Sequence, residues 1–327
     1  MILIGSRAMA IQMQLTDRTN PKTDFDVIMS VEEFMKWHEV NKLNIISLVP
    51  RSANKYKAIV NNNGSRLQYE IELGLEGTSS RFLLENDNEV TRGYTRGHFD
   101  ELYSILSLKY LALTKRSHLI YPIHFEKNIE DYHSMKSYLG PFERDEMMDK
   151  YYILRYGEAA QRNKQRTPKL NVTTEDFFSS KLAVPNYFVH DHIHAMMAHD
   201  GVPMYTKMQP DPSMAWCSKD MFFNLSYKQQ VQCIQEEGYV IALERYIIPQ
   251  HGESCNNFFD CYKRAVKRIC TTLTSGWFRD FAIENYDKAI AWYNPLFAYE
   301  FIQKAQQGQI VPQAEYKLKE VPLFGKL

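Results

Sequence analysis

Short apolar runs separated by polar turns fill the chain up to about residue 95, which predicts a mixed strand-and-helix domain. Alternation or continuous apolar character predicts strands at residues 2–4, 25–29, 45–49, 55–60, 67–73 and 81–84. Helices are expected at 7–15 and 31–38, the second with Ser30 as its N-cap. The Asn-Asn-Asn-Gly sequence at 61–64 predicts a hairpin turn. The segment 74–97, rich in Gly, Ser, Thr and Asn, is interpreted as a loop.

From residue 100 the apolar positions recur with helical spacing. One helical face would carry the apolar residues Leu102, Ile105, Leu106, Ala112 and Leu113. Lys109 falls in the middle of this stripe, where its ammonium group needs an anion or a path to water because burying an unpaired charge is costly. Residues 142–170 read as a charged helix that ends in the basic run 162–169, typical of solvated surface but also able to guide a polyanion.

These patterns predict an α+β chain. Residues 1–140 are expected to form a mixed sheet with adjoining helices, 141–172 a charged linker or helix, and 173–327 a mainly α-helical domain that binds the acceptor. With 327 residues, 44% of them hydrophobic, the chain can bury a sizeable core. No stretch approaches the roughly 20 apolar residues of a membrane span, and no signal-peptide pattern opens the sequence, so a soluble cytoplasmic protein is expected.

Charge and cysteine content narrow the possible functions. Lys plus Arg and Asp plus Glu both number 39, so no global positive field indicates nucleic acid, although local patches could still bind RNA. The five cysteines lie in the second half and include no Cys-x-x-Cys. This usage favours reduced thiols over a disulfide framework or a zinc ribbon.

Acidic residues on two predicted strands suggest a site for divalent ions. Asp24 and Asp26 point to the same face because side chains alternate along a strand, and they lie about 7 Å apart, a separation suited to gripping two ions jointly. The strand 67–73 places Glu70 and Glu72 on its polar face. Glu70 is the better third ligand, and Glu72 remains possible.

Ahead of these acids, the apolar run 2–4 ends at the turn Gly5-Ser6, whose backbone N–H groups could hold phosphate oxygens. This order of features resembles the nucleotidyltransferase superfamily with the DNA polymerase β-like fold. Its signature is an apolar strand, Gly-Gly or Gly-Ser, a short helix, an Asp-x-Asp strand and a third acid on a later strand. The interval from Ser6 to Asp24 is longer than is usual in that family.

Within the superfamily, the abortive-infection toxin-type enzymes are most similar, and the resemblance covers roughly residues 1–140. Their next helix carries a lysine that faces the nucleotide phosphates, which would be Lys109 here, followed by a Lys-Asp-type motif. Lys127 and Asp131 match that motif loosely, since Asn128 stands where an acid is expected. Their i,i+4 spacing fits a solvated surface pair equally well.

The resemblance implies a metal-dependent transferase that moves a nucleoside monophosphate from an NTP, such as ATP, to an acceptor and releases pyrophosphate. Asp24, Asp26 and Glu70 would be catalytic and hold Mg²⁺ or Mn²⁺. The donor nucleotide would be bound by Gly5, Ser6, Arg7, Lys109 and Lys127. The toxin-like resemblance favours RNA, including tRNA, or protein as the acceptor, with a small molecule left open. The sequence does not determine the oligomeric state.

A second hypothesis rests on four histidines, His190, His192, His194 and His199. If their segment is helical, His190 and His194 lie on one shoulder at i,i+4, a spacing that can chelate zinc or iron. The alternative function is therefore a nucleotide-binding protein or metal-dependent hydrolase whose activity resides in the helical domain. Because no His-Glu-x-x-His is present and no third ligand is local, no tightly bound transition metal is expected there.

Overall fold

The structure is a computed structural model of the whole chain. It describes residues 1–15, 24–97, 99, 101–121, 124–166, 201–203, 216–242, 258–271 and 276–306. The chain divides into two units, Met1–Arg166 and Thr167–Leu327. A mixed sheet with helices in the first unit and a mainly helical second unit confirm the predicted α+β fold class.

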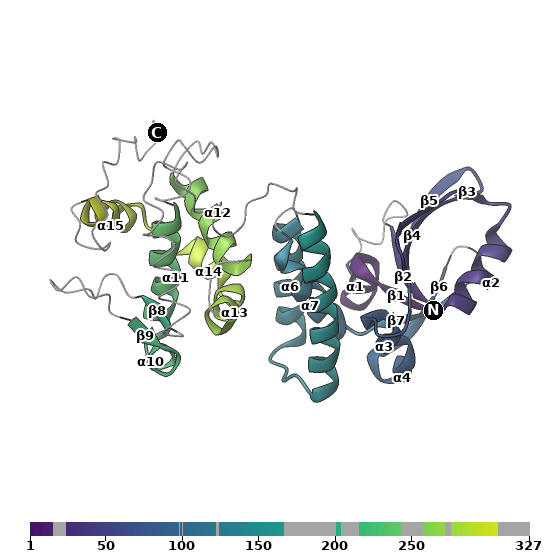
Figure 1. Cartoon of the computed structure of the whole chain (residues 1–327), viewed down its shortest axis with the longest axis horizontal. Helices are drawn as coiled ribbons and strands as arrows, with labels where there is room; N and C mark the ends of the chain where they lie inside the picture. Colours follow the sequence, from purple (N-terminus) through teal and green to yellow (C-terminus); the bar gives the residue numbers. More distant parts are fainter. Residues whose placement is uncertain are drawn as a thin grey trace. The chain divides into compact units, whose positions relative to one another are not determined.

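A seven-stranded mixed sheet organises the first unit (Figure 1), in the order β3-β4-β5-β2-β1-β7-β6. The strands are β1 Ile2–Ile4, β2 Phe25–Met29, β3 Ile45–Ser52, β4 Lys55–Asn62, β5 Ser65–Leu73, β6 Thr91–Arg96 and β7 Leu102–Leu106. The neighbours β2 and β5 are parallel, as are β1 and β7, and the remaining pairs are antiparallel. The predicted strands from residue 2 to residue 73 are all confirmed.

The helices of the first unit are α1 Gly5–Met13, α2 Val31–Asn41, α3 Ser79–Glu85, α4 Asp87–Val90, α5 Leu108–Ser117, α6 Phe125–Leu139 and α7 Glu146–Arg166, with a 3₁₀ turn η2 at His118–Ile120. The N-cap predicted at Ser30 is confirmed and belongs to a capping box, because Ser30 accepts from the N–H of Glu33 and Glu33 accepts from the N–H of Ser30. The hairpin between β4 and β5 turns at Asn63 and Gly64, both with positive φ.

The sheet has one apolar face, which packs against α2. The ring of Phe34 stacks on Tyr56 with centroids 4.9 Å apart, and Trp37 lies 5.3 Å from Tyr69. Because side chains alternate along each strand, the residues between these buried positions point to the other face. That second face carries Asp24, Asp26 and Glu70 and is called the carboxylate face below.

Two predicted elements are wrong. Residues 81–84 belong to α3, whose N-cap Thr78 accepts from the N–H of Arg81, and the supposed loop 74–97 also contains α4 and β6. Residues 102–106 are β7 and not part of a helix. Both are short apolar runs, which periodicity alone cannot assign to helix or strand, and β7 is a strand because it pairs with β1 and β6.

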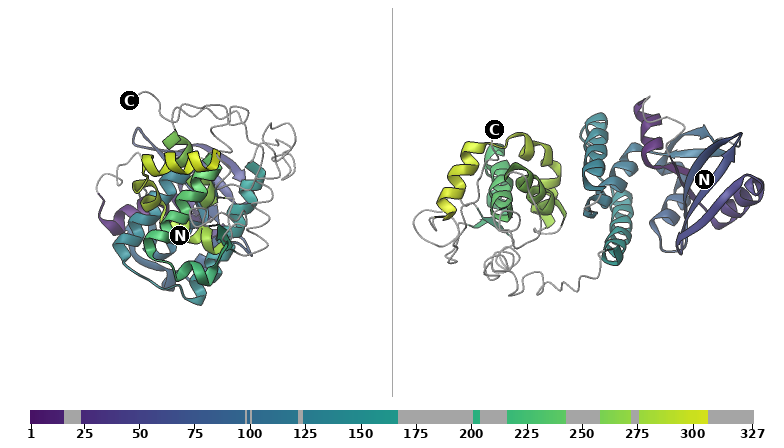
Figure 2. Two further views of the ribbon diagram at one scale, coloured as in Figure 1. Left: turned by 90° about the vertical axis from the view of Figure 1, so that its left-hand side faces the viewer. Right: turned by 90° about the horizontal axis from the view of Figure 1, so that it is seen from above.

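The second unit is mainly helical, with β8 Gly201–Pro203, β9 Trp216–Ser218, α10 Lys219–Phe223, α11 Tyr227–Ala242, α12 Phe258–Thr271, α13 Gly276–Glu284, α14 Tyr286–Ala291 and α15 Pro295–Gln306. Helix α11 lies against α12, α14 and α15 (Figure 2). Tyr239, Tyr262 and Phe278 are fully buried in this unit. In the described ranges, none of the helices has the length and apolar character to cross a membrane.

Candidate active site on the carboxylate face

Two of the predicted carboxylates lie on adjacent strands, and the third lies just before one of them. Because β2 and β5 pair in parallel with Asp26 opposite Glu70, these two side chains share a face. Asp24 immediately precedes β2, two residues before Asp26. Asp26 is half-buried and Glu70 is exposed. Asp24 accepts a hydrogen bond from the Nε2 group of Gln68 at 2.5 Å. The structure therefore brings all three to one region of the carboxylate face.

Gly5 lies directly against the carboxylate of Asp26. A Cβ atom at position 5 would stand 1.9 Å from Oδ2 of Asp26, and the φ of +73° at Gly5 is in the region that favours glycine. Gly5 also begins α1, whose N-cap Ile4 supplies no side-chain hydrogen bond to the first turn. The first N–H groups of that turn, which includes Ser6, therefore start beside Asp26 and can donate hydrogen bonds to anionic oxygens.

Asp26 has a raised pKa, set by burial and by the charges around it. The pKa of Asp26 is raised to about 7, first by burial and then by the negative charges of Glu70 and Asp24, while the positive charges of Lys115 and Lys127 oppose this rise. A carboxyl group in this position ionises fully when a cation approaches, because a positive charge favours the ionised form. The site is therefore short of positive charge as it stands.

Lys115 supplies positive charge to this region from α5. Its side chain is only 12% exposed, and its Nζ atom lies 2.9 Å from Oδ2 of the buried Asp131 on α6. Sequence reasoning missed Lys115 because it placed the start of the helix too early. With the helix beginning at Leu108, the stripe runs through Leu108, Leu111 and Ala112 to Lys115 at the i+7 position.

Lys109, predicted to lie in a buried stripe, is exposed in the first turn of α5. Its Nζ atom lies 5.8 Å from the ring centroid of Phe142. The prediction of a buried stripe was wrong because residues 102–106 form the strand β7. Helical spacing applies only from Leu108, where α5 begins. Lys127 is exposed on α6.

Arg7 lies close to the same carboxylates but on the other side of β2. Its guanidinium carbon is 3.9 Å from the ring centroid of Phe25. Burial lowers the pKa of Arg7, and the nearby Tyr69, Asp24 and Asp26 oppose that effect. Arg7 therefore adds positive charge near the start of β2.

Glu72, the alternative third ligand, has other partners. It is buried, lies 2.7 Å from Nη1 of Arg155, forms an ion pair with Lys55, and accepts from the Ser80 hydroxyl at 2.6 Å. Burial opposes ionisation, but Arg155 and Lys55 hold the pKa of Glu72 well below its usual range. Helices α3 and α7 cover the part of the carboxylate face around Glu72. Glu70 is therefore the glutamate of the two that is exposed to solvent.

The donor set fits a hard divalent cation. Carboxylate oxygens are the ligands that Mg²⁺ and Mn²⁺ prefer, and the missing side chain of Gly5 makes space for the carboxylate of Asp26. Over the described ranges, no group of three His, Cys, Asp or Glu residues stands in ready-made metal geometry. His190, His192, His194 and His199 lie outside the described residues.

Comparisons with known proteins give a family without a function. Residues 110–303 match the family described as Domain of unknown function (DUF7275), which spans more than half of the chain, so the chain belongs to this family. Residues 1–157 match a second description, Domain of unknown function (DUF7277). No curated protein matches the sequence.

One similar solved structure is the crystal structure of an antigenic nucleotidyltransferase-like protein from Paracoccidioides brasiliensis. It shares 11% sequence identity with a TM-score of 0.30, over 52% of this chain and 81% of that chain. A similarity of this size defines no activity for the present chain.

Proposed function

We propose that this protein is a metal-dependent nucleotidyltransferase that moves a nucleoside monophosphate from an NTP to a hydroxyl group of an acceptor. The observation that carries the proposal is the contact of Gly5 with Asp26 where β2 and β5 present Asp24, Asp26 and Glu70 on one face. A glycine turn, a free helix N-terminus and clustered carboxylates together can hold a phosphate chain and the cations that neutralise it.

Each residue has a definite part in this reaction. Asp24, Asp26 and Glu70 hold Mg²⁺ or Mn²⁺, which when bound neutralises charge on the α-phosphate and on the leaving pyrophosphate. Ser6 and the first N–H groups of α1 bind phosphate oxygens. Glu70, exposed at the edge of the site, accepts the proton of the acceptor hydroxyl.

Lys115 replaces Lys109 as the proposed phosphate-binding lysine, because Lys115 affects the ionisation of Asp26 and Asp131 holds its ammonium group in place. Lys127 also influences Asp26, and its exposed ammonium group is suited to the outer end of the triphosphate. Arg7, near the start of β2, is proposed to assist donor binding by its charge.

The test is incubation of the purified protein with each α-labelled nucleoside triphosphate, Mg²⁺ and a cell extract. Transfer of label to a macromolecule or small molecule, with stoichiometric pyrophosphate, is the expected result. The reaction should stop in EDTA and resume with Mg²⁺ or Mn²⁺. Absence of transfer with all four nucleotides and both metals would contradict the proposal.

A further inference from the structure

The carboxylate face extends beyond the catalytic residues onto the hairpin of β4 and β5. Cross-strand pairs put Lys57 opposite Glu70 and Asn61 opposite Arg66, with Gln68 between the two pairs on β5. These five residues form what we call the open strand face. All are half-buried or exposed, whereas the alternate positions Ala58, Val60, Leu67 and Tyr69 are buried on the α2 side.

Two cations on the open strand face have no acidic partner. Within the described part of the chain, neither Lys57 nor Arg66 makes a hydrogen bond or ion pair with another residue, even though Glu70 lies directly across from Lys57. Other exposed cations in the first unit do have such contacts, for example Lys36 with Glu32 and Arg81 with Glu85. Unpaired cations beside a catalytic carboxylate favour an anionic ligand.

The positive charge continues at the enclosed end of the same face. Lys55 neighbours Lys57 on β4 at a two-residue spacing, about 7 Å along the strand, and is 27% exposed. Arg162 on α7 lies 3.8 Å from Glu72 and is 24% exposed. Glu72 is shared by Arg155, Lys55 and Arg162, and the partly exposed Lys55 and Arg162 extend the line of cations that begins at Arg66 and Lys57.

We propose that the open strand face binds a single-stranded nucleic acid, whose phosphates contact Lys57 and Arg66 and whose hydroxyl end reaches Glu70. The inference rests on the proposed function, for which it supplies the acceptor class. A row of cations with amide side chains between them suits a phosphodiester backbone and its sugars, since a single strand is held mainly by charge along its backbone.

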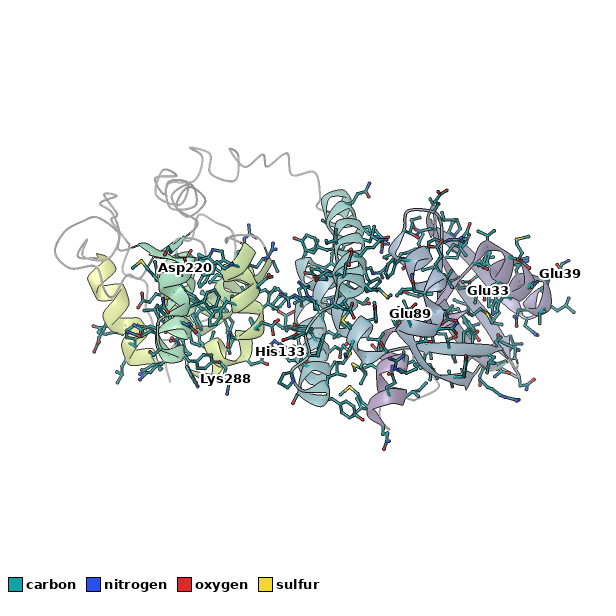
Figure 3. The ribbon with its side chains drawn as sticks, turned by 90° about the horizontal axis from the view of Figure 1, so that it is seen from below. Glu33, Glu39, Glu89, His133, Asp220 and Lys288 are labelled. Carbon is teal, nitrogen blue, oxygen red and sulfur yellow. The ribbon has the colours of Figure 1, made fainter. Side chains whose placement is uncertain are left out.

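The test measures binding without catalysis. A fluorescent single-stranded oligonucleotide of about 20 nucleotides, in RNA and DNA forms, is titrated with the full chain in EDTA without nucleotide. The variant Lys57→Gln/Arg66→Gln removes two charges and keeps exposed polar side chains. The control variant Lys36→Gln/Lys42→Gln removes two charges from α2 on the opposite side of the sheet, where Glu39, the partner of Lys42, points outward (Figure 3).

Wild-type binding should weaken with salt, and the Lys57/Arg66 variant should bind about 10-fold more weakly, with a salt slope smaller by about 1.4, because each single-strand phosphate contact contributes about 0.7. The control should stay within about twofold. Thermal melts confirm that both variants are folded. Whichever of RNA and DNA binds more tightly identifies the acceptor strand.

Three outcomes would overturn the inference: no oligonucleotide binding by wild type at low salt, equal binding by both double variants, or displacement by polyglutamate as effective as by unlabelled oligonucleotide. The last would instead assign the surface to an acidic protein. If the protein binds the oligonucleotide but transfers no nucleotide, the proposed catalysis is wrong and the binding surface stands. If it transfers nucleotide but does not bind the oligonucleotide, the binding surface is wrong and the proposed catalysis stands.

Discussion

At the scale of single residues, the contact between Gly5 and Asp26 sets the chemistry of the site. No side chain can stand at position 5 without displacing the carboxylate, since even a Cβ atom would overlap Oδ2 of Asp26. The same close packing removes water from Asp26 and raises its pKa to about 7. The carboxylate of Asp26 therefore packs against position 5 only because that position has no Cβ atom, and its burial prevents full ionisation until a cation arrives.

Replacing Asp26 by Asn should stabilise the metal-free protein at high pH while abolishing nucleotide transfer. The folded protein holds a proton on Asp26 up to about pH 7, whereas the unfolded chain releases it near the usual aspartate pKa of 3.8. The stability contributed by that proton is complete below the unfolded pKa and is lost as pH rises through the folded pKa. The gain from Asn should therefore grow by on the order of 2 kcal/mol between about pH 5 and pH 8.

Urea unfolding in EDTA, followed by tryptophan fluorescence at both pH values, measures this difference. Glu39→Gln on the outer side of α2 serves as the control and should show no comparable dependence on pH. A wild-type rate of transfer by Asp26→Asn, in a magnesium-dependent assay, would rule out the proposed mechanism.

Variants at the two lysines of α5, Lys115 and Lys109, distinguish a lysine that binds phosphate from one that only adds surface charge. Because removing Lys115 alone would leave Asp131 buried without its partner, the informative variant is Lys115→Gln/Asp131→Asn, which replaces the ion pair by a neutral pair. Its affinity for a non-hydrolysable NTP analogue should fall about 10- to 100-fold, the loss expected for one hydrogen bond to a charged group. Calorimetry measures this, and Lys109→Gln, exposed on the same helix, should bind like wild type.

At the scale of elements, buried salt bridges and hydrogen bonds hold helix α7 against the sheet. Arg155 is buried and donates to Glu72 and to Glu158, and the Ser79 N–H donates to Glu158 at 2.6 Å, so β5, α3 and α7 share one network. The predicted charged helix at 142–170 is thus partly a buried element. Nothing in its sequence pattern shows which of its cations turns inward.

Removing one charged member of this network should destabilise the fold far more than removing an oppositely charged pair. Arg155→Met leaves Glu72 with less compensation in a buried site and should destabilise the fold by about 3–5 kcal/mol. Arg155→Met/Glu72→Leu removes both charges and should recover most of that loss. Urea denaturation of the two variants and wild type provides the comparison, and equal stability of the single and double variants would contradict the role given to the pair.

At the scale of the whole molecule, the first unit extends to Arg166 and includes α7. A fragment of residues 1–166 should therefore fold by itself, with a cooperative thermal transition. A fragment ending at residue 140, the predicted end of the catalytic domain, lacks the buried Tyr151 and Arg155 and should not fold. Circular dichroism melts distinguish the two, and folding of the shorter fragment would show that α7 is dispensable.

The sequence by itself determined what depends on neighbouring residues. The strands that carry Asp24, Asp26 and Glu70, the capped start of α2 and the Asn-Gly turn follow from alternation, capping and backbone preference, all of which act over a few residues. These features put each acid at its place on or beside a strand, and the parallel pairing of β2 with β5 brings Glu70 to the face that carries Asp26.

Only the tertiary structure showed that Glu70 is exposed while Glu72 is enclosed, and that Lys109 is exposed while Lys115 is largely buried against Asp131. Glu72 is enclosed because Arg155, 83 residues later, reaches it, and Lys115 turns inward because the pairing of β7 with β1 delays the start of α5 to Leu108. Burial and charge pairing depend on residues far apart in the chain. A local sequence pattern therefore cannot predict which of two similar side chains will be buried in an ion pair.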